Sequence, residues 1–437
     1  MATPRTTPAG SSSSGGSDGT ITHLRWYICG LLFFATTINY IDRQVLSILK
    51  PVLDRELHLT QSEYGWVLFG FQLSYAVIMP LAGRFVDYVG TRVGYAIAVL
   101  VWSLSAMGHA MAQSALQFGI ARFMLGVGES GNFPAAFRTV ADWFPQSERA
   151  LAGGIFNGGS NIGALIAPVV VPILALHFGW HSAFIFTGAL GLLWLLFWLL
   201  IYRDPERHPR LSVVELAHIR SDNESAEIVR IPWLRLLTER AALAFLAGKV
   251  ITDGVWWFYL YWTPDFLHRK YGLNLKELGL PLVLIYLISD VGSVGGGWIS
   301  SALIKRGWTV TRARKTALLI CAVAVVSASF VPFSGGRLWL AVTLIAIATA
   351  CHQGWSANLF TMVSDTFPRP AVASVVGFGG FGGAVAGMIA APAIGLWLQW
   401  SHDFYAPLFI AAGLAYLTAL AVIHFLLPVF RPVDMRR

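Results

Sequence analysis

Charge is scarce in this chain. Only 12% of its 437 residues are charged, whereas 56% are hydrophobic, and the mean hydropathy is +0.62. A soluble protein of this length carries about twice that fraction of charge. The composition therefore excludes an ordinary soluble globular protein. The net charge of +8 is attributed to membrane orientation and headgroup attraction, and no nucleic-acid partner is expected.

Cysteine is scarce as well. Cys29, Cys321 and Cys351 are the three cysteines, and their spacing matches neither a metal site nor a disulfide framework. The chain also lacks paired metal ligands, a nucleophile motif and any polar domain beyond one central stretch. We therefore expect no cofactor, no metal and no catalytic site. This argues against a polytopic membrane enzyme or sensor, which is the alternative of a different class.

Long hydrophobic runs, in contrast, recur along almost the whole chain. Runs of 18 or more apolar residues predict transmembrane helices, so the predicted fold class is an all-α membrane protein. Twelve spans are predicted, at 24–51, 62–84, 93–113, 116–138, 150–176, 181–201, 241–267, 277–303, 313–333, 338–362, 370–399 and 404–429.

Basic residues are distributed unevenly between the segments that join these spans. With the amino terminus inside, the cytoplasmic segments hold 22 of the 31 lysines and arginines, and the external segments hold six. Both termini are therefore predicted to be cytoplasmic. The expected divisions are a disordered cytoplasmic tail (1–23), a six-helix bundle (24–202), a cytoplasmic loop (203–240), a second six-helix bundle (241–430) and a short tail (431–437).

Two local signals refine this division. The first 20 residues are rich in serine, threonine and glycine and lack an apolar core, so they are not a signal peptide. In the central loop, Ser212 and Glu215 have the spacing of a capping box, which predicts that a short helix begins there.

The two predicted bundles are related by an internal repeat. Asp142 and Asp365 lie in similar Asp-aromatic-Pro stretches 223 residues apart, and Gly131 matches Gly354 at the same offset. A duplicated unit of this size predicts two bundles related by an axis along the membrane normal. The same offset matches Glu129 with His352.

The first span carries charge where charge is costly. Asp42 and Arg43 lie about 16 residues into an apolar run that spans roughly 42 Å as a helix. Charged groups at this depth are functional candidates by default. Adjacent residues on a helix point about 100° apart, so these two are not expected to pair with each other. A mutually neutralised structural pair is the alternative.

Span 4 contributes a second mid-membrane pair of charges. Arg122 and Glu129 are seven residues apart, so they share one helix face. Gly126 and Gly128 permit close contact with neighbouring helices. Glu129 is a candidate proton carrier, because burial disfavours a charged carboxyl. The alternative is a glycine-packed interface with one solvated glutamate.

Spans 5, 7, 8 and 10 hold further polar or aromatic groups. Lys249 and Asp253 stand at i and i+4, where mutual neutralisation is the favoured interpretation. Asp290 is an intramembrane acid with no assigned partner. The repeat places His352 at the depth of Glu129, and of His352 and Gln353 one is expected to face the cavity while the other packs. The remaining candidates for substrate contact are Asn157, Ser160 and Asn161 in span 5, Trp256 in span 7, and Trp355 and Asn358 in span 10.

A cytoplasmic motif follows span 2. The residues Gly83, Asp87, Gly90 and Arg92 allow a tight turn and a charge latch between helices. This stretch resembles the signature loop of the major facilitator superfamily, and the twelve spans in two sixes fit that superfamily throughout. The resemblance implies that these four residues control conformational exchange and do not touch the substrate.

A closer resemblance rests on Tyr40, Asp42 and Arg43 in span 1, Tyr75 in span 2, and Arg122 with Glu129 in span 4. Together they resemble the anion:cation symporter family, and Gly159–Gly163 with Thr252–Asp253 and the aromatic run after them resemble its hexuronate transporters. The resemblance implies that Asp42 and Glu129 couple protons and that Arg43 holds the substrate carboxylate. Tyr40, Tyr75 and Arg122 join the expected substrate-binding set.

The sequence thus predicts a proton-coupled symporter, a monomer in the bacterial cytoplasmic membrane. Its expected substrate is a monovalent sugar-acid anion such as glucuronate or galacturonate. An aldonate or aldarate transporter and a phosphate-ester antiporter are the alternatives within the superfamily. The glycine-rich span 11 argues against aldonates, and the two central acids argue against a phosphate ester, which several converging basic residues would bind.

Overall fold

A computed structural model describes residues 23–221, 238–431 and 433. The described residues form helices and turns and contain no strand. The predicted amino-terminal tail lies outside the described residues apart from His23. So do most of the carboxyl-terminal tail and residues 222–237 of the predicted central loop.

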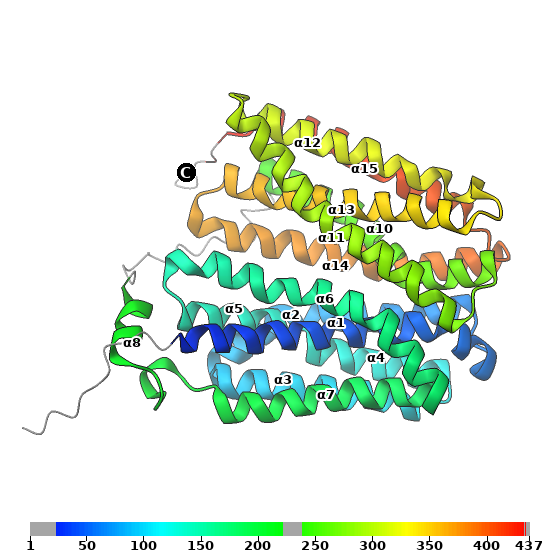
Figure 1. Ribbon diagram of the computed structural model, residues 1–437. Coiled ribbons are helices and arrows are strands. Elements are labelled where there is room, and N and C mark those ends of the chain that lie inside the picture. The colour runs from blue at the N-terminus through cyan, green and yellow to red at the C-terminus, as the bar shows by residue number, and fades with distance from the viewer. Residues whose placement is uncertain (1–22, 222–237, 432, 434–437) are drawn as a thin grey trace, which may run out of the picture.

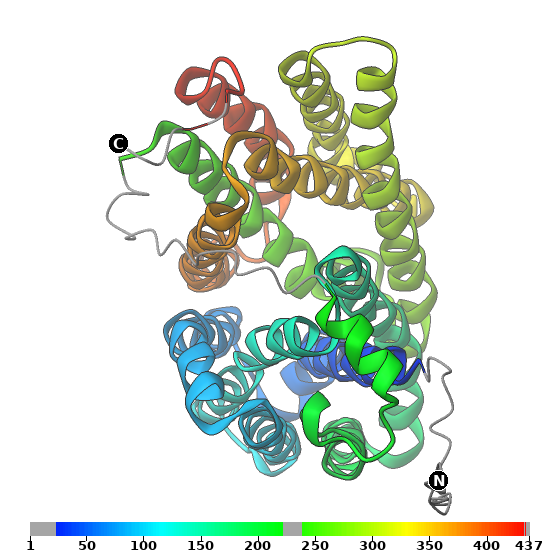
Figure 2. The ribbon, with the colours of Figure 1, turned by 90° about the vertical axis from the view of Figure 1, so that its left-hand side faces the viewer.

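The helices before residue 202 lie together on one side of the molecule, and those from residue 240 onward lie on the other (Figures 1 and 2). The first group comprises α1 (Leu24–Leu57), α2 (Gln61–Val89), α3 (Thr91–Gly108) with the 3₁₀ turn η1 (His109–Met111), α4 (Ala115–Glu129), α5 (Asn132–Trp143), α6 (Gln146–Phe178) and α7 (Trp180–Ile201). We call this group the first half.

The second half comprises the helices from residue 240 onward. They are α10 (Arg240–Tyr271), α11 (Leu275–Lys305), α12 (Val310–Val325) continued by η3 (Val326–Ser334), α13 (Leu338–Thr366), α14 (Arg369–Trp400) and α15 (Ala406–Leu426). Between the halves lie η2 (Pro205–Arg207) and the short α8 (Val213–Arg220). Helix α1 begins at the end of the molecule that lies beside α8 (Figure 1), and we call this end the α8 end. We call the opposite end the far end.

Ten helices of the described residues are long and apolar enough to cross a membrane. They coincide with ten of the twelve predicted spans. The other two predicted spans correspond to α1, which carries charged residues along its length, and to the pair α4 and α5. The prediction that span 4 is one continuous helix was wrong, because α4 ends at Glu129 and α5 begins at Asn132. There the Gly131 amide bonds the carbonyl of Gly128 rather than that of Val127, which tightens the turn.

Glycine brings several helices into close contact. A Cβ on Gly159 would lie 2.3 Å from the Phe33 carbonyl oxygen, and one on Gly296 would lie 2.2 Å from the Cα of Gly354. Only glycine permits α6 to approach α1, and α11 to approach α13, this closely. Gly126 and Gly128 likewise press against α2 and α3, as the sequence predicts.

The helix predicted in the central loop is confirmed as α8. Ser212 Oγ accepts the Glu215 amide at 3.1 Å, which begins the helix. The buried Glu215 carboxylate also accepts the Arg25 guanidinium at 3.0 Å, and Arg25 pairs with Glu148 at 2.8 Å. Because Arg25 belongs to α1 and Glu148 to α6, these bonds attach α8 to the first half.

The internal repeat is visible in the contacts. Thr91 Oγ1 donates to Asp142 at 3.4 Å, and Arg314, 223 residues after Thr91, pairs with Asp365 at 2.8 Å. Each contact joins the start of one helix to the end of another within the same half. The predicted offset therefore places equivalent residues at equivalent positions in space.

Candidate functional site

The mid-membrane charges of the first half form one buried ion pair. Arg43 Nε lies 2.6 Å from Glu129 Oε2, and both side chains are almost fully buried, with 3% and 0% exposure. The break after α4 leaves Glu129 at the carboxyl end of that helix, facing α1. The prediction that Asp42 and Arg43 would not pair with each other is confirmed, because Arg43 pairs across helices instead.

Three aromatic rings surround the Arg43 guanidinium. Its Cζ lies 5.0 Å from the ring centre of Tyr40, 5.2 Å from Phe71 and 4.8 Å from Tyr75. Such rings stabilise a cation that has little access to water. The Arg43 Nη2 atom is buried and has no hydrogen-bond partner among the described residues. The Nη2 edge of the guanidinium can therefore still donate to an anion.

Asp42 and Arg122 occupy different positions from Arg43. Arg122 Nη2 donates to the Arg43 carbonyl at 2.8 Å, and Nη1 reaches the Asp42 carbonyl at 3.5 Å, so this arginine bonds the α1 backbone. The Asp42 carboxyl is buried near Thr187 and forms no ion pair within the described part of the chain.

A cavity of about 240 Å³ lies between the two halves. Its lining is mostly polar and comes from both of them. The first half contributes Tyr40, Asn157, Ser160, Asn161 and Ala164, and the second contributes Lys249, Asp253, Trp256, Trp257, Leu260, Tyr286, Ser289, Asp290, Ser293, His352, Gln353 and Ser356. Seven residues of the predicted substrate set therefore border one space.

The second half supplies a fixed wall to this cavity. Trp256 stacks on His352 with ring centres 4.7 Å apart and 8° between planes. His352 Nδ1 lies 2.5 Å from the Tyr416 hydroxyl, which holds the imidazole in place. His352 and Gln353 both border the cavity, so the expectation that one would pack away from it was wrong. Adjacent residues on a helix point about 100° apart, so the cavity extends around at least that much of the circumference of α13.

Lys249 and Asp253 introduce charge into this wall. Lys249 Nζ lies 2.6 Å from Asp253 Oδ2, so the favoured interpretation of mutual neutralisation is confirmed. Asp290 also borders the cavity and forms no ion pair among the described residues. The cavity therefore holds one neutralised pair and one unpaired carboxyl.

Two predicted contact residues lie away from this cavity. Trp355 is buried against Tyr416, with ring centres 5.5 Å apart. Asn358 Nδ2 donates to the carbonyls of Gly296 and Gly354 at 2.8 and 2.9 Å, so it bonds the backbones at the contact of α11 with α13. In this structure both side chains are used in packing, and neither borders the cavity. Arg43, Tyr75, Arg122, Asp42 and Glu129 also lie outside the cavity lining.

Tyr40 connects the two parts of the site. Its ring contacts the Arg43 guanidinium on one side and borders the cavity on the other. Tyr40 is therefore the residue of the cavity lining that also contacts Arg43 through its ring.

The far end contains a second buried charge cluster, which sequence reasoning missed. The fully buried Asp265 carboxylate accepts Lys50 at 2.9 Å, Gln61 at 2.9 Å, Arg269 at 3.0 Å, and the Tyr405 hydroxyl. Asp54 pairs with Lys50 and Arg269, each at 2.7 Å, and Asp403 accepts Arg269 at 2.9 Å and Gln61 at 2.7 Å. We call these seven residues the far-end network.

The far-end network joins the two halves, because Lys50 and Gln61 belong to α1 and α2 whereas Asp265 and Arg269 belong to α10. Gly65 supports the same closure, since a Cβ there would lie 2.7 Å from the Ala391 carbonyl oxygen. The i, i+4 spacing of Asp265 and Arg269 was the signal available in the sequence. It could not indicate a partner on α1.

The ion pairs at the α8 end stay within one half. Asp87 pairs with Arg138 at 3.2 Å, which joins α2 to α5. The predicted latch thus exists, although its arginine lies outside the motif. Arg92 Nη2 donates to the Leu199 carbonyl at 2.5 Å, and Gly90 has a φ of 85°, which favours glycine. Gly83 faces Pro134 on α5. No ion pair of the described residues joins the halves at this end.

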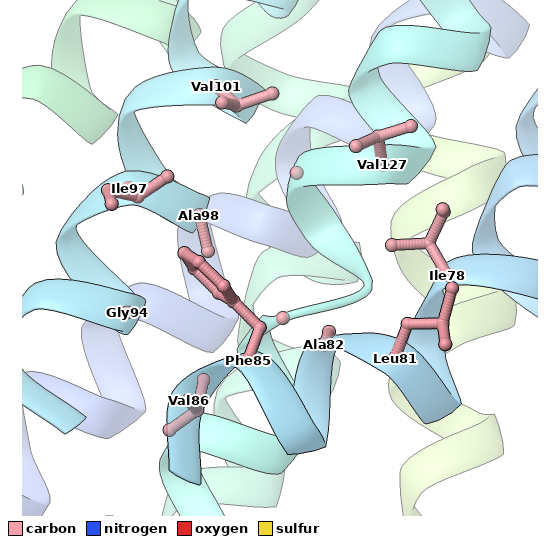
Figure 3. A pocket seen from close by; sticks show the side chains of 12 residues that line it. Ile78, Leu81, Ala82, Phe85, Val86, Gly94, Ile97, Ala98, Val101 and Val127 are labelled. Carbon is pink, nitrogen blue, oxygen red and sulfur yellow. The ribbon is translucent and has the colours of Figure 1, made fainter. Parts of the chain in front are cut away.

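A further hollow of about 170 Å³ lies within the first half and is lined by small and apolar side chains of α2, α3 and α4 (Figure 3). Ile78, Phe85 and Val101 are among them. Nothing in this hollow can pair with a carboxylate, so it is not a candidate site for a sugar acid.

Comparisons with known proteins agree with this arrangement. The model of the Major Facilitator Superfamily matches residues 32–391. The hexuronate transporter of Escherichia coli (strain K12) is 30% identical over 378 residues, which cover 85% of this chain and 87% of that protein. A probable galactarate/D-glucarate transporter of Bacillus subtilis (strain 168) is 31% identical over 385 residues, covering 83% of this chain and 81% of that protein.

The fold is similar to that of solved transporters. A bacterial homolog of the human lysosomal transporter Spinster, in an inward-facing and occupied conformation, has a TM-score of 0.71 at 18% identity, over 93% of this chain and 95% of that one. The relatives are transporters, so the alternative of a membrane enzyme or sensor is set aside, and the chain is a multi-pass protein of the cell membrane. The match over residues 32–391 and the helical fold together place the chain in the Major Facilitator Superfamily, to which it belongs.

Proposed function

We propose that this protein is a proton-coupled importer of a monovalent sugar acid, most specifically a hexuronate such as glucuronate or galacturonate. The observation that carries the proposal is the polar cavity between the halves, separated by Tyr40 from a buried arginine with a free donor. The cavity offers hydrogen bonds for hydroxyls, and Arg43 offers a partner for one carboxylate. Sugar acids are also what the named relatives carry.

The topology that we propose has twelve spans. The ten apolar helices account for ten spans, and α1 and the pair α4 and α5 account for the other two. The charges near the middle of these two spans, Asp42, Arg43, Arg122 and Glu129, are buried inside the protein. Such charges are tolerated in a membrane when they face a partner or a cavity. Both termini are then cytoplasmic, the α8 end faces the cytoplasm, and the far end faces outside. The two bundles are residues 24–202 and 241–430, and the protein acts as a monomer.

Competition for Arg43 is the proposed coupling mechanism. When the substrate carboxylate binds Arg43, Glu129 loses its paired cation. A buried carboxylate without that partner takes up a proton, so substrate and proton are carried together. Asp42 lies in the same buried layer without an ion pair and is the second proposed proton site.

The membrane potential explains the need for a proton. An anion that enters a negative-inside cell is opposed by about 2.3 kcal/mol per 100 mV. One accompanying proton removes this cost, and a second makes the potential favour uptake.

Alternating access is proposed to occur by rocking of the halves. In this structure the far-end network joins the halves at the proposed external side, whereas no described ion pair joins them at the α8 end. The external route to the cavity is therefore closed, and this arrangement is one that exchanges substrate with the cytoplasm.

A second candidate substrate is an aldarate, a sugar acid with two carboxylates. Lys249 borders the cavity and can exchange Asp253 for a second substrate carboxylate, and one relative is named for galactarate and D-glucarate. A monovalent hexuronate is preferred because it leaves the Lys249–Asp253 pair intact.

Thermal-shift and uptake measurements test these proposals. Purified protein is screened against glucuronate, galacturonate, galactarate, galactonate and glucose 6-phosphate, because a ligand stabilises the state that it binds. Proteoliposomes are then assayed for uptake driven by an imposed proton gradient. We expect stabilisation by hexuronates and accumulation that collapses with the gradient. Stabilisation by the phosphate ester alone, or uptake indifferent to the gradient, would contradict the proposal.

A further inference from the structure

The outer surface of the second half carries a groove of about 840 Å³ between α12 and α15. It shares no lining residue with the cavity between the halves. Its long wall is apolar and open to the surroundings, with Leu319 46% exposed and Phe425 81% exposed. Leu417 and Leu420 line the same wall. A hydrocarbon chain is the complement of such a surface.

The α8 end of this groove is basic. Arg312, Lys315 and His424 line it there, and none of them pairs with an acid among the described residues. Lys315 Nζ lies 2.8 and 2.7 Å from the carbonyl oxygens of Leu427 and Pro428 and 3.1 Å from His424 Nδ1, so its three donors are used within the protein and its charge is fixed at the rim. The positive charge at this end therefore has no internal counter-ion.

The basic and apolar groups of the groove are separated along the helix axes in the same order as the headgroup and the acyl chain of a lipid. Arg312 and Lys315 lie in the first two turns of α12, and His424 lies in the last turn of α15. Leu319 lies one turn beyond Lys315, about 6 Å deeper. The Arg312 guanidinium rests on the Trp308 ring at 4.1 Å, and tryptophan is typical of the headgroup level of a membrane.

We propose that this groove binds an anionic phospholipid of the cytoplasmic leaflet. The phosphate bonds Arg312 beside the positive charge of Lys315, and an acyl chain lies along Leu319, Leu417 and Leu420. Basic pockets between transmembrane helices on the cytoplasmic side suit such headgroups. The leaflet assignment rests on the orientation given under the proposed function, whereas the chemistry of the groove does not.

The carboxyl-terminal segment is not the occupant that the structure favours. Pro428 and Val429 border the α8 end of the groove, and the Phe430 amide donates to Thr311 Oγ1 at 3.0 Å. The Val433 amide then donates to the Thr366 carbonyl at 2.8 Å, so the described chain turns toward α13 and leaves the apolar wall uncovered. A second copy of the protein would bring the same basic rim against itself, which like charge opposes. Charge complementarity leaves an anionic amphiphile.

Native mass spectrometry of the delipidated, detergent-purified protein tests the assignment. The protein is titrated with phosphatidylglycerol and with phosphatidylethanolamine carrying the same acyl chains. We expect tighter binding of phosphatidylglycerol, and we expect Arg312→Gln to weaken it at least fivefold without changing phosphatidylethanolamine binding. Arg306→Gln is the matched control, because Arg306 is exposed at the same end but lies outside the groove.

A second variant probes the apolar wall. Leu319→Trp fills the groove and should weaken both lipids. Equal affinity for the two lipids, or an equal effect of Arg306→Gln and Arg312→Gln, would overturn the assignment in favour of general surface attraction. Displacement of the lipid by inorganic phosphate alone would overturn it as well. The measurement uses no transport assay, so its failure and a failure of the sugar-acid proposal are independent outcomes.

Discussion

Two of the buried ion pairs among the described residues differ in which parts of the chain they connect. Arg43 and Glu129 lie at mid-depth and both belong to the first half. Lys50 and Asp265 lie at the far end and belong to different halves. A pair within one half persists when the halves rock, whereas a pair between halves must break. The first region is therefore suited to binding and protonation, and the second to controlling access.

The strongest test of this distinction is Glu129→Gln. The amide removes the titrating group but keeps nearly the same shape, so substrate can still bind Arg43 and the halves can still rock. We expect proteoliposomes with this variant to lose proton-driven accumulation altogether and to retain exchange of labelled for unlabelled substrate. If the variant still concentrates substrate under a proton gradient, Glu129 is not a coupling residue.

Asp265→Asn is expected to have the next largest effect. The change removes the one fully buried carboxylate that Lys50 and Arg269 share and leaves them with Asp54, and removing one partner of a buried pair costs at most about 3–5 kcal/mol. The closed far end should therefore become less populated. Ser62 bonds Gln399 of the second half there through its amide, so Ser62→Cys provides a site for labelling by a membrane-impermeant thiol reagent.

The labelling experiment has an internal control. In a background without the three native cysteines, Asp265→Asn should speed labelling of Ser62→Cys several-fold. Glu206→Gln removes an exposed pair with Arg220, outside both helical halves, and should leave the labelling rate unchanged. Equal rates in the Asp265→Asn and parent proteins would mean that the far-end network does not hold the halves together.

Arg43→Lys tests whether Arg43, in the mid-depth region, binds the substrate carboxylate. Lysine keeps the charge but loses the second donor that a carboxylate needs for a two-point contact. Substrate affinity measured by calorimetry should fall by more than ~1.5 kcal/mol, the scale of a hydrogen bond to a charged group. Unchanged affinity would favour Arg122 as the anion-binding residue, or a purely structural Arg43.

The smallest expected effect concerns substrate choice. His352→Ala and Gln353→Ala each remove one polar group from the cavity wall. Glucuronate and galacturonate differ in the orientation of one hydroxyl, so at least one variant should change the ratio of the two affinities. Asn358→Ala is the control outside the cavity and should leave that ratio as it is. If both cavity variants keep the affinity ratio of the parent protein, this wall does not distinguish the orientation of the hydroxyl.

Much of the fold follows from the sequence because a membrane constrains composition strongly. Helices need long apolar runs, and ten of the predicted spans coincide with helices that meet this requirement. The break between α4 and α5 was not predicted, since glycines such as Gly131 are compatible with a continuous helix. It depends on the packing of α4 against its neighbours, where a Cβ on Gly128 would lie 2.4 Å from the Trp102 backbone.

The candidate site was predicted less completely than the fold. Depth along a helix indicates that Arg43 and Glu129 lie at mid-membrane, but only the packing of α4 against α1 makes them partners. The repeat correctly predicted that His352 borders the cavity. It could not show that Asn358 is used to bond α11 to α13. Lys50 and Asp265 are 215 residues apart in the chain, so no local pattern connects them.

The single carboxylate of Asp265 has a kinetic consequence. It accepts hydrogen bonds from four residues on α1, α2, α10 and the start of α15. Two of these donors, Lys50 and Gln61, belong to the first half, so opening of the far end must break both of their bonds to the same carboxylate at nearly the same moment, whereas the bonds from Arg269 and Tyr405 stay within the second half. We therefore expect the outer side to open in one cooperative step with a large activation enthalpy. Transport should then slow steeply on cooling, even where substrate binding itself changes little.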